Sequence, residues 1–344
     1  MIDLRSDTVT LPSDEMKQFM FNAPLGDDVY GDDPSINSLE EKSSDIFGKE
    51  ASLFVPSGTM ANLISVLTHC NRGDEIILGN KSHIFVYEAG GTSVFGGVHS
   101  HQLNNNNDGT INLEDIKNSI RNVEDPHHPK SKLVCLENTH NICYGAPIDE
   151  NYFDDVKNIV EKHNLQLHID GARIFNAAVA LNKTVENLAK NADSITCCLS
   201  KGLSSPAGSL IMGNKDFICK ARYIRKALGG GMRQSGILAS AGIYSFDNMI
   251  ERLEEDHSNA KLLAEGLSEI DEIKIDLTKI YTNIIFFNLK NTPIKDDELI
   301  SYLFNNNIKI DSKGNRKFRM VTHYGFEKND ISTVINQLKL ILKK

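Results

Sequence analysis

The stretch Ser194–Met212, SITCCLSKGLSSPAGSLIM, contains two apolar runs separated by a loop of small residues. Its only charged residue is Lys201, which lies between the runs Ser194–Leu199 and Ser209–Met212. Short apolar runs bounded by Gly, Ser and Pro are typical of buried β-strands. Enclosure among uncharged residues favours the neutral amine of a lysine, and a neutral amine is a nucleophile toward aldehydes. A loop lysine that reaches solvent along its own stem is the alternative interpretation.

Similar apolar runs lie elsewhere in the chain and alternate with segments of helical spacing. Strand-like runs occupy Ala51–Val55, Glu75–Leu78, Leu133–Leu136 and Leu165–Ile169, and Phe153–His163 has the spacing of a helix. Strands that alternate with helices favour a mainly parallel sheet that is wrapped by helices. The sequence therefore predicts an α/β fold.

The length of 344 residues is enough for two domains. A long helical stretch, about Gly236–Leu267, separates the alternating region from a smaller C-terminal unit with two strand-like runs and two helices. We predict a large domain over residues 1–245, including the N-terminal segment, and a small domain over residues 246–344. Residues 1–32 are expected to be irregular, since they lead into a stretch rich in Gly and Asp, GDDVYGDDP.

The composition argues against several classes of partner. The net charge of -9 is unsuited to a nucleic-acid backbone, whose binding depends on clustered Lys and Arg. Six cysteines occur without a Cys-x-x-Cys pair, which favours reduced thiols in the cytoplasm. The start, MIDLRSDTVT, lacks the basic and apolar regions of a signal peptide, and no apolar run approaches membrane-spanning length. We expect a cytoplasmic protein without a nucleic-acid, membrane or metal partner.

Three polar motifs follow strand-like runs, at the sheet edge where ligands collect in such folds. Ser57, Gly58 and Thr59 precede a helix, whose free amides bind a phosphate or are simply capped. Asp170 ends another run and is either a ligand-binding acid or a helix cap. Together with Lys201 these residues fit pyridoxal 5'-phosphate: the lysine bonds to its aldehyde, the acid keeps its ring nitrogen protonated, and the helix end binds its phosphate.

Nine blocks of sequence make the interpretation more specific. The chain resembles the L-threonine aldolases, which are fold-type I pyridoxal phosphate enzymes, in SDTVT (6–10), GDDVYGDDP (26–34), FVPSGTMAN (54–62), SHIFVYEAGG (82–91), LENTHN (136–141), HIDGARIFNA (168–177), CLSKGLSSPAGS (198–209), LGGGMRQSG (228–236) and RMVTH (319–323). The resemblance implies a large domain with a mainly parallel sheet and a smaller α+β C-terminal domain. It also implies cleavage of L-threonine, L-allo-threonine and other β-hydroxy-α-amino acids to glycine and an aldehyde, by a homotetramer of two dimers with shared active sites.

The same resemblance assigns residues to the cofactor. Lys201 matches the lysine that bonds to it, Asp170 the partner of the ring nitrogen, and His83 the imidazole stacked on the ring. The cup Ser57-Gly58-Thr59 matches the phosphate site. Arg173 matches an arginine beside the cofactor, and Arg233 one that approaches the phosphate of a neighbouring subunit.

Other matched residues concern the substrate, a small amino acid. Ser6 and Arg319 match the pair that binds its carboxylate, and Arg173 lies beside that pair. His127 aligns with a histidine near the substrate hydroxyl, although the chain reads His-His-Pro-Lys where the family usually has His-Phe-Pro-Arg. The register there is open, and both histidines also fit a plain loop. The resemblance therefore leaves His127 and His83, acting directly or through water, as alternative bases.

Two other functions compete with an aldolase. A β-eliminating lyase or racemase on the same fold shares the lysine, the aspartate and the phosphate cup. A non-catalytic protein that binds pyridoxal phosphate or an amino acid is disfavoured, because every matched functional residue is present. A nicotinamide enzyme is disfavoured as well, since no G-x-G-x-x-G follows a strand. The sequence leaves open the preference between threo and allo substrates and the physiological aldehyde.

Overall fold

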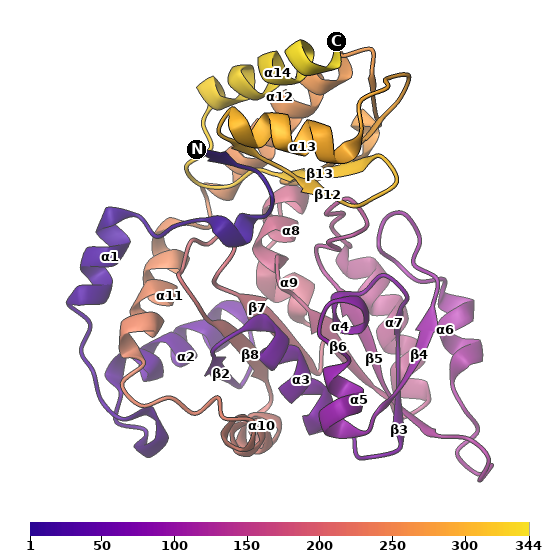
Figure 1. Ribbon diagram of the computed structural model, residues 1–344. Helices are drawn as coiled ribbons and strands as arrows, with labels where there is room; N and C mark the ends of the chain where they lie inside the picture. The colour runs from indigo at the N-terminus through magenta and orange to yellow at the C-terminus, as the bar shows by residue number, and fades with distance from the viewer. Residues whose placement is uncertain (344) are drawn as a thin grey trace.

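The computed structural model describes residues 1–343, and within that range a large sheet of seven strands dominates the molecule (Figure 1). Its strands are β2 (Ala51–Val55), β3 (Asp74–Gly79), β4 (His99–Leu103), β5 (Lys130–Glu137), β6 (Gln166–Asp170), β7 (Ser194–Cys198) and β8 (Ser209–Gly213). They lie in the order β2-β8-β7-β6-β5-β3-β4. All neighbours from β7 to β4 pair in parallel, whereas β8 is antiparallel to both β2 and β7. The predicted α/β class with a mainly parallel sheet is confirmed.

Helices before, between and after these strands surround the sheet. They are α2 (Pro34–Phe47), α3 (Gly58–His69), α4 (His83–Val86), α5 (Gly91–Gly96), α6 (Leu113–Ser119), α7 (Glu150–Lys162), α8 (Ile174–Leu181), α9 (Val185–Ala189) and α10 (Lys215–Ala227). In α7 the buried residues are Phe153, Val156 and Val160, whose spacing places them on one face toward the core. Among residues 1–343, no helix combines the length and the apolar character that crossing a membrane requires.

Two expectations about helices were wrong. Residues 14–21 form a helix, α1 (Asp14–Phe21), although the N-terminal segment was expected to be irregular. Ser13 caps α1 by accepting a hydrogen bond from the amide of Met16, and acidic residues in the first turn favour its start. The long helix predicted near residues 236–267 is two helices, α11 (Gly236–Asn248) and α12 (Leu253–Ser268), and residues 249–252 between them change the direction of the chain (Figure 1).

A C-terminal unit, residues 253–343, lies above the large sheet in Figure 1 and has its own apolar core. Its elements after α12 are β9 (Ile273–Ile275), β10 (Ile284–Leu289), α13 (Asp296–Asn305), β12 (Asp311–Ser312), β13 (Lys317–Val321) and α14 (Lys328–Leu342). The strands form an antiparallel sheet in the order β12-β13-β10-β9. Phe287 and Phe318 stack within the core of this unit. The proposed domain boundary at residue 245 falls within α11.

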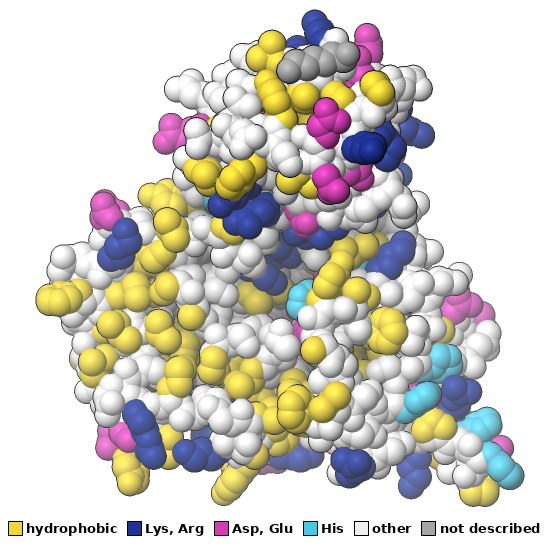
Figure 2. Space-filling view, in the orientation of Figure 1, with side chains coloured by type: hydrophobic (Ala, Val, Ile, Leu, Met, Phe, Trp, Pro, Cys, Tyr) yellow, Lys and Arg dark blue, Asp and Glu magenta, His cyan; other side chains and the backbone are white. Residues whose placement is uncertain are grey.

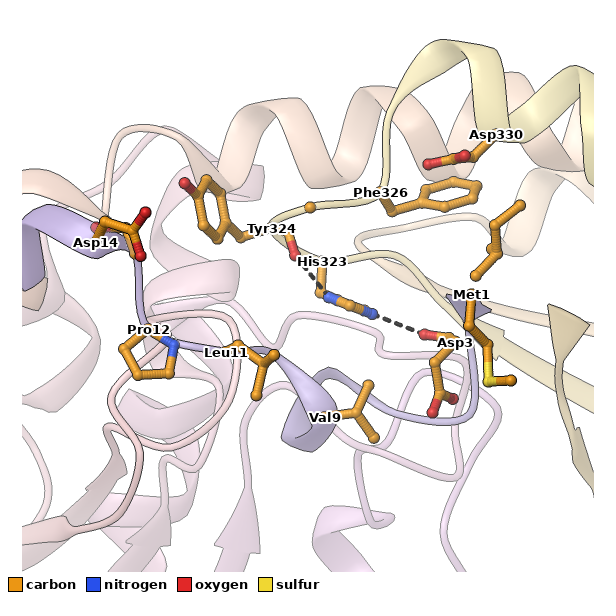
Figure 3. Close-up of a pocket in the computed structure, with 13 residues that line it drawn as sticks. Met1, Asp3, Val9, Leu11, Pro12, Asp14, His323, Tyr324, Phe326 and Asp330 are labelled. Carbon is orange, nitrogen blue, oxygen red and sulfur yellow. Dashed lines mark hydrogen bonds between the residues drawn. The ribbon is translucent and has the colours of Figure 1, made fainter. Parts of the chain in front are cut away.

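The first ten residues, which we call the N-terminal strap, are bound to this C-terminal unit. Strand β1 (Ile2–Asp3) pairs in parallel with β11 (Ile308–Lys309). Figure 3 shows His323 next to the strap: its Nε2 lies 2.8 Å from the carbonyl oxygen of Asp3. From there the strap crosses toward the large sheet and forms the short turn η1 (Asp7–Val9). It thereby links the two parts of the fold.

Candidate active site

A cavity of about 270 Å³ lies between the carboxyl edge of the large sheet and the C-terminal unit. Its lining residues come from the strap, from loops after four strands and from the C-terminal unit: Ser6, Thr8, His83, Tyr87, Asn141, Arg173, Lys201, Lys313 and Arg319. Lys and Arg side chains gather in the hollow between the two parts in Figure 2. A larger cavity of about 670 Å³ lies beside the strap (Figure 3), but none of the described residues that line it is Lys or Arg. The smaller cavity is lined by Arg173, Lys201, Lys313 and Arg319 and is therefore a candidate for binding anions.

One side of the site, which we call the deep end, consists of Asn62, His83, Glu88 and Asp170. Asp170 is the last residue of β6 and is 2% exposed. The side-chain amide of Asn62, on α3, donates to Asp170 Oδ2 at 2.9 Å and to Glu88 Oε1 at 2.8 Å. The backbone amide of Ala172 donates to the other oxygen of Asp170. Two buried carboxylates thus share one amide group.

His83, the first residue of α4, completes the deep end. Its Nδ1 lies 2.8 Å from Glu88 Oε1, and its backbone amide donates to Glu137 at 2.7 Å. Burial lowers the pKa of His83, but the hydrogen bond with Glu88 and the charge of Asp170 outweigh burial and raise it. Burial also raises the pKa of Glu88, and the charge of Asp170 adds to that shift.

The deep end is suited to a positive charge. Ligand atoms of His83, Glu88 and Asp170 lie within 4.8 Å of one another. Two carboxylates and one imidazole in a buried space accommodate a further cation, which is either a metal ion or a protonated ring nitrogen. This arrangement fits the cofactor that the resemblance implies, because its ring nitrogen is a cation when protonated.

Lys201 follows β7 and lines the same cavity. The loop turns tightly there, since the amide of Ser204 donates to the carbonyl oxygen of Lys201 at 2.9 Å. The side chain is partly buried rather than fully enclosed. Lys201 lines the cavity together with Ser6 and Thr8 of the strap, and its positive charge contributes to lowering the pKa of Asp7.

The predicted phosphate cup lies at the start of α3, outside the residues that line the cavity. Ser57 caps the helix by accepting a hydrogen bond from the amide of Met60 at 3.3 Å. Ser57 and Thr59 are exposed, so their hydroxyl groups and the first helix amides are open to a ligand. At Gly58 a Cβ would come within 2.6 Å of the sulfur of Cys198, so a larger residue does not fit there.

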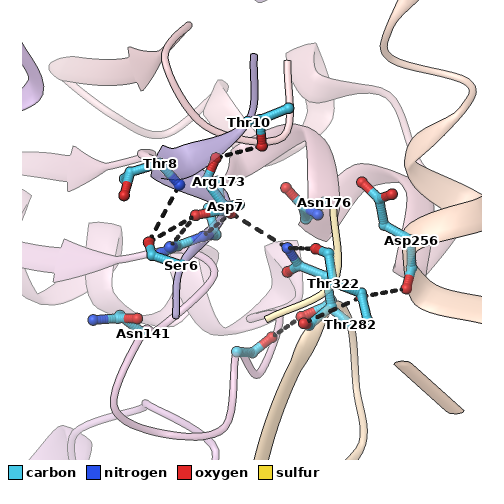
Figure 4. A network of polar contacts seen from close by, with 12 residues as sticks. Ser6, Asp7, Thr8, Thr10, Asn141, Arg173, Asn176, Asp256, Thr282 and Thr322 are labelled. Carbon is cyan, nitrogen blue, oxygen red and sulfur yellow. Dashed lines mark hydrogen bonds and ion pairs between the residues drawn. The ribbon is translucent and has the colours of Figure 1, made fainter. Parts of the chain in front are cut away.

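The opposite side of the site, the arginine end, consists of Ser6, Asp7, Arg173 and Arg319. Arg173 donates from Nε and Nη2 to the two oxygens of Asp7, each at 2.7 Å, and both side chains are buried (Figure 4). Burial alone would raise the pKa of Asp7, but the charge of Arg173 outweighs it and holds that pKa far below its usual value. Two of the three nitrogens of Arg173 are therefore occupied by a residue of the strap.

Arg319, on β13, has an open donor. Its Nη1 donates to Asn141 at 2.8 Å and its Nη2 to the carbonyl oxygen of Arg5 at 2.9 Å. Its Nε is buried without a hydrogen-bond partner among residues 1–343. Burial lowers the pKa of Arg319, and the charge of Arg173 lowers it further. A buried guanidinium with a free N–H is ready to bind a carboxylate.

Besides the phosphate cup and Asp170, two predicted site residues are absent from the lining of the cavity. His127 precedes β5, at the end of that strand opposite Glu137; its side chain is 87% exposed and pairs with Asp125. Arg233 is 52% exposed and pairs with Asp27 at 3.0 Å. A single chain brings neither residue to the deep end or the arginine end.

Sequence reasoning assigned no role to Asn62, Glu88 or Asp7. All three fall inside blocks that carry the resemblance, FVPSGTMAN, SHIFVYEAGG and SDTVT. Their importance comes from burial and from partners far away in the chain, such as Asp170 for Asn62 and Arg173 for Asp7. The one available signal was their position beside residues that had already been selected.

The chain is similar to several known proteins. A family described as beta-eliminating lyase matches residues 3–291. The chain is 45% identical over 338 residues to an Arabidopsis thaliana protein named "Probable low-specificity L-threonine aldolase 2", covering 97% of this chain and 95% of that protein. It is 42% identical over 344 residues to the low specificity L-threonine aldolase of Escherichia coli K12, covering 100% of both. A solved threonine aldolase of Leishmania major has the same fold, with a TM-score of 0.83 at 20% identity over 99% of this chain and 100% of that one.

Proposed function

The chain belongs to the beta-eliminating lyase family, and on this premise we propose that it is a pyridoxal phosphate-dependent threonine aldolase. It cleaves L-threonine, L-allo-threonine and other β-hydroxy-α-amino acids to glycine and an aldehyde. The observation that carries this proposal is the identity of 42% to 45% with low-specificity L-threonine aldolases over nearly the whole chain. The cavity supports it, since Lys201, His83 and Arg319 line one small space.

Four groups of this chain would hold the cofactor. Lys201 would bond to its aldehyde, Asp170 would pair with its ring nitrogen, His83 would lie against the ring, and the start of α3 would bind its phosphate. When bound, pyridoxal phosphate supplies an electron sink for the pair left on Cα after the bond to Cβ breaks. Arg233 is proposed to approach the phosphate of a neighbouring subunit.

The arginine end would orient the substrate. Arg319 can donate from its free Nε, and Ser6 adds a hydroxyl beside it. Asp7 holds Arg173 in one orientation, so that this arginine contributes charge without rotating freely. When the substrate carboxylate is held in one place, the orientation of the other bonds to Cα is set as well. That orientation decides whether the bond to Cβ or the bond to hydrogen breaks.

We assign His83 to the proton of the β-hydroxyl group, directly or through water. It lines the cavity, and the contact with Glu88 that raises its pKa makes it a stronger proton acceptor. His127 is proposed to act only in the pocket of a neighbouring subunit. Replacing each histidine by Ala separates these roles, because His83→Ala and His127→Ala serve as controls for each other.

The products test the function directly. L-Threonine and L-allo-threonine should both give glycine and acetaldehyde. A β-eliminating lyase would instead give 2-oxobutanoate and ammonia, and this result without glycine would overturn the proposal. Treatment with borohydride should attach the cofactor to the peptide that contains Lys201, and attachment to another lysine would move the cofactor site.

We also propose a homotetramer of two dimers in the cytoplasm. Large apolar side chains are exposed near the N-terminal segment and α10, among them Phe21, Leu25, Tyr30 and Tyr223, and apolar groups are spread over this face in Figure 2. Such exposure favours contact with another copy. The cysteines among residues 1–343 are unpaired, which fits a reducing compartment. Light scattering of the purified protein measures the assembly.

A further inference from the structure

Behind Asp170, away from the cavity, a row of buried polar side chains extends the deep end. It runs from Asn62 to His168 on β6, then to Ser194 on β7 and His69 at the end of α3. His168 and Ser194 are fully buried, and Asn62 is 2% exposed. The proposed mechanism uses none of these four residues, although polar groups in a core require a reason to be there.

The direction of each hydrogen bond can be deduced from Asn62. Its amide nitrogen faces carboxylate oxygens of Asp170 and Glu88, and an amide oxygen in that position would be repelled. Asn62 Oδ1 must then accept, and His168 Nε2, at 3.2 Å, must carry a hydrogen and donate to it. A second donor to the same oxygen is the hydroxyl of Thr196 at 3.1 Å.

The deduction continues to the far end of the row. Burial lowers the pKa of His168 to about 4, so the ring is neutral and its Nδ1 accepts from the hydroxyl of Ser194 at 2.8 Å. The Ser194 oxygen in turn accepts from His69 Nε2, also at 2.8 Å. Burial lowers the pKa of His69 to about 3, so it is neutral too. Every donor in the row therefore points toward Asp170.

We propose that Asn62 and His168 are positioning residues that hold Asp170 ionised and aimed at the cofactor ring nitrogen. This inference rests on the proposed function, in which Asp170 pairs with that nitrogen. Asn62 fixes the carboxylate through its amide, and His168 fixes Asn62 in the one orientation that donates. Without His168 the hydroxyl of Thr196 is the one remaining donor to Asn62 Oδ1 among residues 1–343, so the Asn62 side chain is held less firmly against Asp170.

The test compares two substitutions of one histidine. Gln reaches the position of Nε2, so His168→Gln keeps the donor to Asn62, whereas Asn reaches only the position of Nδ1, so His168→Asn loses it. We expect the dissociation constant of pyridoxal phosphate to stay within about twofold of wild type for His168→Gln and to rise roughly tenfold for His168→Asn. The pH at which the visible absorption of the bound cofactor changes should move in His168→Asn only.

Three further variants complete the experiment. Asn62→Asp places a third carboxylate in the deep end and should weaken cofactor binding more than His168→Asn does, while Ser194→Ala, one bond farther away, should weaken it less. If His168→Asn lowers only the melting temperature and leaves the absorption titration and the affinity at wild-type values, the inference is wrong. Asp170→Asn tests the underlying function. An unchanged absorption titration in Asp170→Asn overturns the assignment of Asp170. A changed titration in Asp170→Asn, together with wild-type affinity and titration in Asn62→Asp, overturns only the inference.

Discussion

At the deep end Asp170 accepts hydrogen bonds from Asn62 and from the amide of Ala172, whereas at the arginine end Arg319 keeps its Nε without a partner. The deep end is built from α3, β6 and the region of α4, which belong to one sheet and its helices. The arginine end joins the strap, a loop after β5 and β13, which belong to different parts of the fold.

The difference separates two ways of preparing a site. Polar groups of the deep end are satisfied within the protein, so their geometry is fixed before a ligand arrives. The arginine end contains a buried donor that has no partner among residues 1–343. Changes at the deep end should therefore alter the rate of reaction, and changes at the arginine end should alter substrate binding.

The largest effect is expected for Asp170→Asn. An ion pair at about 3 Å in an effective dielectric near 20 contributes roughly 5 kcal/mol, and losing most of it should lower kcat roughly 10³-fold. Cofactor occupancy, read from absorbance, should remain high at saturating pyridoxal phosphate. Steady-state kinetics on L-threonine measure the loss. A kcat near that of wild type at full occupancy would contradict the contrast between the two ends.

Arg319→Lys should act on substrate binding. A lysine has no donor at the position of Nε, and a charged hydrogen bond contributes about 1.5–3 kcal/mol, so KM should rise roughly 10- to 100-fold. Arg316→Lys is the matched control, because Arg316 binds carbonyl oxygens of Thr292 and Ile294 instead of lining the cavity. Weaker cofactor binding with an unchanged KM would show that Arg319 does not bind the substrate carboxylate.

Acid should lower the free energy of unfolding through His168. Its pKa is about 4 in the folded protein, against 6.5 ordinarily, so the unfolded chain binds more protons between these pH values. The free energy of unfolding therefore falls as the pH falls through this window, by about 2 kcal/mol at pH 5. Urea unfolding at pH 7 and pH 5 measures this loss, which should be smaller by that amount in His168→Gln. Equal losses in both proteins would show that another group is responsible.

The smallest effect is expected for Lys313→Ala. Lys313 and Arg319 both contact Asp311 Oδ2, at 2.7 Å and 3.1 Å. Without Lys313 that carboxylate binds Arg319 alone and competes with the substrate for it. Partly exposed ion pairs contribute less than about 1 kcal/mol, so KM should rise about two- to fivefold. Lys339→Ala, which removes a pair with Glu269 on another surface, is the control and should leave KM unchanged.

Periodicity and strand ends were enough to predict the sheet, and with it Asp170 and Lys201. Each of these residues follows an apolar run, and parallel strands bring such residues to one edge. The arginine end needed the resemblance, because nothing local in RMVTH indicates that Arg319 meets the strap. Asn62 and Glu88 could not be predicted as partners of Asp170, since Asn62 is 108 residues away from it and their contact depends on tertiary packing.

Local signals also failed for helix boundaries. α1 is a short helix whose stability depends on the cap at Ser13, and the Gly and Asp residues that follow it suggested an irregular segment. His127 illustrates a different limit, because the resemblance supplied a role for it while the register of the alignment there stayed open.

The strap has a consequence for the order in which the protein can be completed on the ribosome. Asp7 is synthesised long before its partner Asn283, which is 276 residues later, and the carbonyl oxygen of Arg5 long before its donor Arg319, which is 314 residues later. At about 5–20 residues per second, these partners follow after roughly 15–60 s. The large sheet can form while translation continues, but the arginine end cannot. A nascent chain released before β13 would hold the deep end and lack the means to orient a substrate.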